Sequence, residues 1–166
     1  MDADDGFEEF YRTTRHRVVT VLYALGGDLS EAQDAAQEAY ARAWQRWNTI
    51  SGYGDPEAWV RTVGHRLLIN RWRKIRNGVT AYRRHGVAPS VGPPSENTVA
   101  LVTALRQLPA EQREAIVLHH LADLSVAEIA AQTDTPTGTV KARLSRGRRA
   151  LAELLDTTLP EEVSNA

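Results

Sequence analysis

Apolar residues recur along most of this chain every three to four positions, which is the spacing of helices that bury one side. The pattern predicts helices that begin near Asp5, just after Gly27 and at Pro56, followed by several more beyond Asn97. Residues 48–55 interrupt it with Asn, Ser, Gly and Asp, which favour turns, and are predicted to form a loop. The periodicity therefore indicates an all-α protein.

The first three predicted helices each carry an apolar side that would form the core of an N-terminal domain. Their expected N-caps are Asp5, completed by Glu8 in a capping box, Asp28 or Ser30, and Asp55 with Pro56 at the first helical position. The residues expected to face inward are Phe7, Phe10, Tyr11, Val18, Val21, Leu22 and Leu25, then Ala32, Ala35, Ala36, Ala39, Tyr40, Ala43, Trp44 and Trp47, then Trp59, Val63, Leu67, Ile69 and Trp72.

Beyond Arg76 the apolar periodicity ends, and prolines alternate with glycine and serine. Such a composition is typical of a linker, which is assigned to residues 77–96. The predicted fold is thus two small helical domains joined by a flexible linker, at residues 1–76 and 97–155. Residues 156–166 are expected to form a disordered tail. The second domain would bury Val99, Val102, Leu105 and Leu108, then Ile116, Val117, Leu118 and Leu121.

The segment Leu124–Leu155 has the pattern of a helix-turn-helix. Ser125 can cap a short helix, with Glu128 reaching back in a capping box. A turn with Pro136 and Gly138 follows, and then a second helix. In this motif the second helix enters the DNA major groove, so the segment predicts DNA binding. Its inward side would carry Val140, Leu144, Gly147 and Leu151.

The second helix of this motif is strongly cationic, and no acidic residue lies between Thr137 and Ala152. Like charges at helical spacing repel one another, and a polyanionic partner would offset that cost. The alternative is a solvated basic face near a helix C-terminus, where cations are favoured in any case. The five cations are Lys141, Arg143, Arg146, Arg148 and Arg149.

A second basic patch joins aromatic and cationic side chains within the predicted third helix. Aromatic and guanidinium planes stack on exposed bases, and cations hold phosphates, so the composition suits single-stranded or melted DNA. Alternatively, Trp59 and Trp72 are core residues. The patch comprises Trp59, Arg61, His65, Arg66, Asn70, Arg71, Trp72, Arg73, Lys74 and Arg76.

Charge is segregated along the 166 residues, although the formal net charge is only −1. Residues 1–55 hold five basic and ten acidic residues, whereas residues 57–86 hold eight basic residues and one acid. An acidic helical block followed by two basic patches indicates two kinds of partner, a protein surface and a nucleic acid. Chance unevenness on solvated helices is the alternative for the acidic block.

Composition also excludes several classes of site. The chain has no cysteine, so it forms no disulfide and no thiolate metal site, which fits a reducing cytoplasm. It has no apolar run of membrane-spanning length and no signal-peptide pattern, so a soluble cytoplasmic protein without membrane insertion is expected. No cofactor is expected. His119 and His120 are neighbours that would point to different helix faces, so no metal site is expected either.

With both patches placed, the chain resembles the extracytoplasmic-function (ECF) sigma factors of bacterial RNA polymerase. The polymerase-binding helix of the family's region 2 is similar to the segment DLSEAQDAAQEAYARAWQRW. The promoter-melting helix of that region is similar to PEAWVRTVGHRLLINRWRK, and the family's region 4 is similar to LRQLPAEQREAIVLHHLADLSVAEIAAQTDTPTGTVKARLSRGRRAL. The resemblance implies a promoter-specificity subunit without catalytic residues. It also implies that region 2 is held on the polymerase while it helps to open the minus-10 DNA.

The resemblance further implies roles for single residues. The residues that would bind the β′ clamp helices of core polymerase are Asp34, Gln37, Glu38 and Arg42. The loop Ile50–Asp55 and the helix after it would recognise the minus-10 element and a flipped base, with Trp59, Arg61, His65, Arg66, Asn70, Arg73 and Lys74. The minus-35 element would be read by Thr139, Lys141, Ala142, Arg143, Ser145, Arg146 and Arg149.

Region 4 would also touch the β flap of the polymerase. Many members of the family are held inactive by an anti-sigma factor, and the sequence leaves open whether this chain is. One departure concerns Gly64-His65-Arg66, where the family commonly has Ala-Arg-Asn, and Asn70, where an Asp is frequent. Arginine supplies a charged fork in place of a neutral amide, which leaves the minus-10 preference open.

Two other functions are compatible with parts of the pattern. An ordinary helix-turn-helix regulator would bind promoter duplex tightly without polymerase. A nuclease or recombinase would need clustered carboxylates for metal ions, or a placed nucleophile with a base. The basic patches contain almost no acids, which argues against catalysis.

Overall fold

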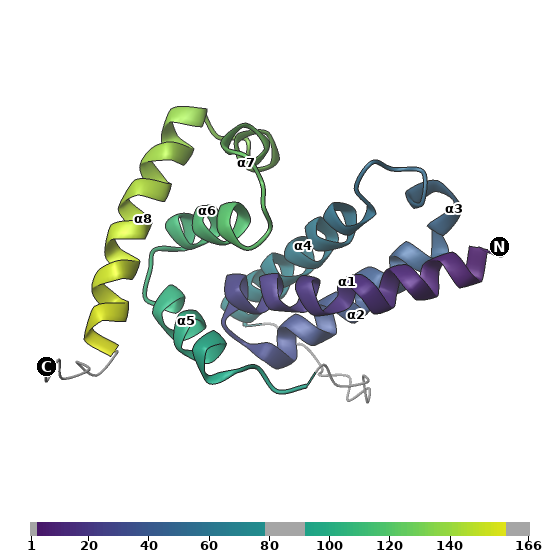
Figure 1. Cartoon of the computed structure of the whole chain (residues 1–166), viewed down its shortest axis with the longest axis horizontal. Coiled ribbons are helices and arrows are strands. Elements are labelled where there is room, and N and C mark those ends of the chain that lie inside the picture. The colour runs from purple at the N-terminus through teal and green to yellow at the C-terminus, as the bar shows by residue number, and fades with distance from the viewer. Residues whose placement is uncertain (1–2, 79–91, 159–166) are drawn as a thin grey trace, which may run out of the picture. The chain divides into compact units, whose positions relative to one another are not determined.

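The computed structural model describes residues 3–78 and 92–158, and these residues form helices and no strand (Figure 1). The all-α prediction is confirmed. The chain divides into two compact units, an N-terminal unit of residues 1–93 and a C-terminal unit of residues 94–166. The helices are α1 (Ala3–Gly26), α2 (Leu29–Gln45), α3 (Trp47–Ile50), α4 (Pro56–Arg76), α5 (Glu96–Arg106), α6 (Ala110–His120), α7 (Val126–Thr133) and α8 (Thr137–Thr158).

In the N-terminal unit, α1 and α2 are antiparallel, and α4 packs against both. The ring of Phe7 contacts Trp44 near one end of this pair, and the Thr14 hydroxyl lies 2.6 Å from that of Tyr40 further along. A stripe of small residues lets α2 approach its neighbours closely. The buried alanines of this stripe are Ala32, Ala35, Ala36, Ala39 and Ala43.

Side-chain caps begin several helices where the sequence predicts them. Asp28 accepts a hydrogen bond of 3.0 Å from the backbone N–H of Glu31, so Asp28 rather than Ser30 caps α2. Asp55 caps α4 and Ser125 caps α7 in the same way. Each cap satisfies a backbone N–H that has no partner within its helix.

The N-terminal unit departs from the prediction in three places. Helix α1 already begins at Ala3, before the expected cap Asp5. The short helix α3 occupies the start of the expected loop. Trp44, expected to face inward, is 46% exposed, because it lies at the open edge of the α2 stripe beside Phe7.

The buried side of α4 is also shifted from the prediction. Val60, Gly64 and Leu68 are buried, whereas Trp59, Val63 and Leu67 are only partly buried. A Cβ atom at Gly64 would lie 2.7 Å from Cδ1 of Leu22, so α1 and α4 approach closely at this glycine. The spacing of large apolar residues does not predict this contact, because a glycine makes it.

The C-terminal unit is a four-helix domain in which α8 packs against α5, α6 and α7. Its core includes Leu105, Ile116, Leu118, Ile129 and Val140. Helix α7 is followed by its C-cap residue Asp134, whose φ of 49° is left-handed, and the turn then leads into α8. These two helices form the predicted helix-turn-helix.

The ends of this unit differ slightly from the prediction. Helix α5 includes Glu96, which the sequence pattern places in the linker, and Val99 is exposed rather than buried. Helix α8 continues to Thr158, so the first three residues of the expected tail are helical. Most of the predicted linker and tail lies at residues 79–91 and 159–166, outside the described residues. None of the described helices combines the length and apolar character needed to cross a membrane.

Candidate nucleic-acid interface

Helix α8 presents one exposed polar face opposite its buried side. Val140, Leu144 and Gly147 are buried. The predicted minus-35 residues Thr139, Lys141, Ser145, Arg146 and Arg149 are exposed, and Ala142 and Arg143 are partly buried. Residues three, four or seven apart share a side of a helix, so Ala142, Ser145, Arg146 and Arg149 form one surface.

A glycine sets the distance between α8 and the rest of the unit. A Cβ atom at Gly147 would lie 2.9 Å from Cγ1 of Ile116, which is closer than side chains normally approach. Helix α8 therefore rests directly on α6. This contact fixes how far the exposed face of α8 projects from the domain.

Two of the five cations on α8 interact with their own domain at the flanks of the helix. Arg143 lies 3.9 Å from a carboxylate oxygen of Glu111, and its side chain is 25% exposed. The Nε of Arg148 donates a 3.0 Å hydrogen bond to Nε2 of His120. Arg146 and Arg149 lie between these flanks, on the side opposite Val140. The structure thus divides a cluster that the sequence presents as one basic face.

A second exposed face lies on α4. Arg66, Asn70, Arg73 and Lys74 are exposed, and Trp59, two turns before Arg66, is partly buried. The spacing of seven, four and three residues places Trp59, Arg66, Asn70 and Arg73 on one side of the helix.

Two residues predicted for that face are not on it. Arg61 is 5% exposed and His65 is 9% exposed. Both lie beyond Leu68 around the helix, on the side away from Arg66 and Asn70, because consecutive residues are separated by 100°. Burial lowers the pKa of His65 to about 4, so it is neutral at neutral pH. Their assignment to the DNA face is corrected on these grounds.

The loop before α4 has one prominent side chain. Ile50, at the start of the predicted minus-10 loop, is buried, whereas the ring of Tyr53 is 46% exposed. Asp55 is engaged as the N-cap of α4. Tyr53 belongs to the loop that the resemblance assigns to the minus-10 element, but the sequence analysis does not single it out; its position between two glycines is the signal in the sequence.

The four predicted polymerase-binding residues share one side of α2. Gln37 and Arg42 are exposed, and Asp34 and Glu38 are partly buried. Glu38 forms an ion pair of 2.7 Å with Arg42 and lies 3.7 Å from Arg71 of α4. Arg71, which the sequence placed in the cationic patch, is therefore attached to α2 and lies apart from the exposed face of α4.

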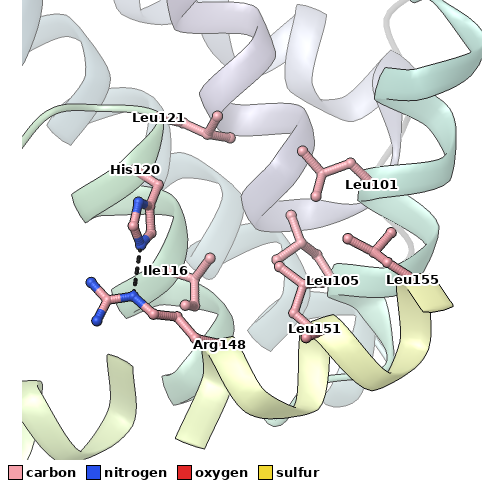
Figure 2. Close-up of a pocket in the computed structure, with 9 residues that line it drawn as sticks. Leu101, Leu105, Ile116, His120, Leu121, Arg148, Leu151 and Leu155 are labelled. Atoms are coloured by element: carbon pink, nitrogen blue, oxygen red, sulfur yellow. Dashed lines mark hydrogen bonds between the residues drawn. The ribbon is translucent and has the colours of Figure 1, made fainter. Parts of the chain in front are cut away.

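The C-terminal unit also contains an apolar groove of about 350 Å³ between α5, α6 and α8 (Figure 2). Seven of its nine lining residues are apolar, and the other two are the hydrogen-bonded pair His120 and Arg148. Sequence periodicity assigns leucines to a core and gives no sign of a groove among them. The lining residues are Leu101, Leu105, Ile116, His120, Leu121, Arg148, Leu151, Ala152 and Leu155.

The two adjacent histidines use ring nitrogens in hydrogen bonds. Nδ1 of His119 lies 2.8 Å from the carbonyl oxygen of Leu124, and Nε2 of His120 accepts from Arg148. Their rings meet edge-to-face at 4.9 Å. Within residues 3–78 and 92–158, His, Asp and Glu side chains form no group of three or more that could hold a metal ion.

Both units match families of known proteins. Residues 10–78 match Sigma-70 region 2, and residues 98–151 match Sigma-70, region 4. The chain is 36% identical over 146 residues to the ECF RNA polymerase sigma factor SigL of Mycobacterium tuberculosis, with 82% of each chain covered. This chain belongs to the ECF RNA polymerase sigma factors. It is also 30% identical to the RNA polymerase sigma-E factor of Streptomyces coelicolor, over 90% of this chain and 85% of that protein.

Solved sigma factors share the fold. The sigma factor RpoE of Bartonella quintana, crystallised with the anti-sigma factor NepR, matches with a TM-score of 0.72 and 24% identity, covering 91% of this chain and 97% of that one. The ECF sigma factor SigJ of Mycobacterium tuberculosis matches with a TM-score of 0.55 and 27% identity, covering 87% of this chain but 52% of that one.

Family membership confirms the predicted function. As an ECF sigma factor, this protein is a promoter-specificity subunit, and RNA polymerase is its partner. An ordinary helix-turn-helix regulator would match region 4 alone, whereas this chain matches regions 2 and 4 in order.

Proposed function

We propose that the two units of this sigma factor contact the two promoter elements separately while α2 holds the protein on core polymerase. The observation that carries the proposal is the presence of two cationic helix faces, one on α4 and one on α8, in the segments that match regions 2 and 4. Each face alone is small. Binding to polymerase raises the effective concentration of one element once the other is bound.

The α8 face reads the minus-35 element in the major groove. Arg146 and Arg149 lie at its centre beside the small residues Ala142 and Ser145, so the helix backbone can approach the bases. Arginine makes bidentate hydrogen bonds to guanine, and Thr139 and Ser145 can bind bases or phosphates. Lys141 and Arg143 lie on the flanks of the face, where phosphates border the groove.

The α4 face holds the melted minus-10 strand. Arg66, Arg73 and Lys74 contact phosphates, the Asn70 amide reads a base edge, and the Trp59 ring supports a base. The loop at residues 51–55 completes this site. Because the face binds separated strands better than duplex, it shifts the DNA toward the open form.

The α2 face binds the β′ clamp helices of the polymerase. Glu38 is held between Arg42 and Arg71, so its side chain is oriented before binding. Asp34 and Gln37 extend the same face by one turn. The chain supplies no catalytic group in this proposal, because the polymerase makes the bonds.

The apolar groove of the C-terminal unit receives the β flap. A groove of this lining suits an amphipathic helix that buries an apolar stripe. The Bartonella sigma factor was crystallised with an anti-sigma factor, and a protein of that class is a further proposed partner here.

The decisive experiment measures binding to promoter DNA with and without core polymerase. We expect little specific binding by the isolated protein and specific binding by the holoenzyme. Arg146→Ala should lose about 1–3 kcal/mol of binding free energy on the minus-35 element and little on unrelated DNA. An equal loss on all sequences would make Arg146 a phosphate contact.

The polymerase face is tested with Glu38→Lys. The charge reversal should weaken core binding while leaving helix content unchanged. Glu9→Lys, which reverses an exposed carboxylate on α1 and leaves the four proposed residues untouched, is the matched control. If Glu38→Lys left core affinity as it was, the α2 assignment would be refuted.

A further inference from the structure

Arg148 lies apart from the exposed DNA-facing side of α8. Arg148 and Arg149 are adjacent, so their side chains leave the helix 100° apart. Arg149 lies on the surface with Arg146, whereas Arg148 lines the apolar groove at the end opposite Leu155 (Figure 2). The exposed part of the Arg148 side chain therefore faces the groove and not the DNA-facing side of α8.

A hydrogen bond fixes the guanidinium of Arg148 at that edge. Its Nε donates to Nε2 of His120 at 3.0 Å, as the dashed line in Figure 2 shows. Because His120 accepts this bond, its Nε2 carries no proton. Burial, with the neighbouring charges of Arg148 and His119, lowers the pKa of His120, which favours that neutral form.

Because His120 is neutral, the hydrogen bond does not compensate the positive charge of Arg148. Apart from these two residues, the described lining of the groove is apolar, and it contains no acidic side chain. A guanidinium held at Nε still presents its two terminal nitrogens as a fork, which is the geometry that binds a carboxylate.

We propose that Arg148 binds a carboxylate on an amphipathic helix of core polymerase that docks in this groove. The inference rests on the proposed function, in which the groove receives the β flap. It adds the chemistry of the partner: an apolar stripe with an Asp or Glu beside one end. Two neighbouring arginines thus serve different macromolecules, Arg149 the DNA and Arg148 the polymerase.

The dimensions of the groove agree with such a partner. Along α8 it extends from Arg148 to Leu155, a separation of seven positions or roughly 10 Å. That length accommodates about two turns of a docked helix, with apolar residues at positions i, i+3, i+4 and i+7. Arg148 lies at one end, so the carboxylate belongs at the end of the stripe.

The test compares Arg148→Ala with Arg149→Ala in the full-length protein. Affinity for core polymerase and affinity of the assembled holoenzyme for a minus-35 duplex are measured for each. Arg148→Ala should weaken core binding about tenfold or more and leave minus-35 discrimination unchanged, because a charged hydrogen bond at an interface is lost. Arg149→Ala should show the reverse. Arg148→Lys should restore only part of core binding, because lysine lacks the fork.

A third variant distinguishes this inference from the function on which it rests. Leu101→Ser alters an apolar lining residue of the groove on α5. If Leu101→Ser weakens core binding and Arg148→Ala does not, the groove docks the polymerase but the carboxylate contact is refuted. If neither variant weakens core binding, docking in the groove is itself wrong. Helix content measured by circular dichroism checks that each variant folds.

The salt dependence of core binding supplies a second measurement. Screening weakens an interaction between charges, so raising ionic strength should weaken core binding of the unaltered protein more than that of Arg148→Ala. Equal salt dependence of the two proteins would overturn the proposal.

Discussion

Replacing Gly64 by alanine tests the close packing of α1 on α4. The added Cβ would lie 2.7 Å from Cδ1 and 3.3 Å from Cδ2 of Leu22. Carbon atoms normally approach to about 3.5–4.0 Å, so the first contact is about 1 Å too short. Leu22 is completely buried, so its side chain has to shift within the core to make room for the added methyl group.

Two opposing effects determine the result. Alanine is favoured over glycine in a helix interior by about 0.8–1.0 kcal/mol. Overpacking a filled core costs about 1–3 kcal/mol. We therefore expect Gly64→Ala to lower the free energy of unfolding of the N-terminal unit by about 1 kcal/mol, although the same change usually stabilises a helix.

Urea unfolding followed by tryptophan fluorescence measures this unit by itself. The four tryptophans of the chain all lie in it, at Trp44, Trp47, Trp59 and Trp72. Gly6→Ala is the matched control, because a Cβ at Gly6 would make an ordinary 3.6 Å contact with Trp47. That change should stabilise the unit by up to about 1 kcal/mol.

A double-mutant cycle with Leu22→Ala identifies the cause. Leu22→Ala alone should cost about 2–5 kcal/mol, because it leaves a cavity. The added methyl of Gly64→Ala would partly fill that cavity, so the double variant should be more stable than the sum predicts, by at least about 1 kcal/mol. Stabilisation by Gly64→Ala alone, with additivity within about 0.5 kcal/mol, would refute the reasoning.

Three further predictions concern single interactions. Because the Thr14 hydroxyl already donates to a backbone carbonyl, the Tyr40 hydroxyl donates to Thr14 at 2.6 Å. Tyr40→Phe removes this hydrogen bond and should lower the free energy of unfolding by about 0.5–1.5 kcal/mol in the fluorescence assay. Asp55→Ala removes the cap at the Ala58 N–H and should cost about 1 kcal/mol, whereas Asp55→Asn should cost little. The folded state lowers the pKa of His120, so it binds fewer protons than the unfolded state. The stability of the C-terminal unit should therefore fall as pH drops below about 6.5 and level off below the lowered pKa. His120→Gln should flatten that dependence in circular dichroism, and an unchanged pH profile would contradict it.

Local features of the sequence predict much of this protein. The caps Asp28, Asp55 and Ser125 and the helix-turn-helix are confirmed by the structure. Each depends on residues within a few positions of one another, so local hydrogen bonding and apolar spacing suffice to indicate it. The order of three family-like segments likewise predicts an ECF sigma factor, and the family matches confirm it.

The sequence alone could not determine which side of a helix is buried or which cations remain exposed. The buried side of α4 depends on Gly64, because only its lack of a side chain lets Leu22 approach. Arg71 and Arg148 look like DNA-binding cations in the sequence, yet one lies against Glu38 and the other binds His120. Their partners come from other helices, so only the packing of those helices decides which positive charges are left to face DNA.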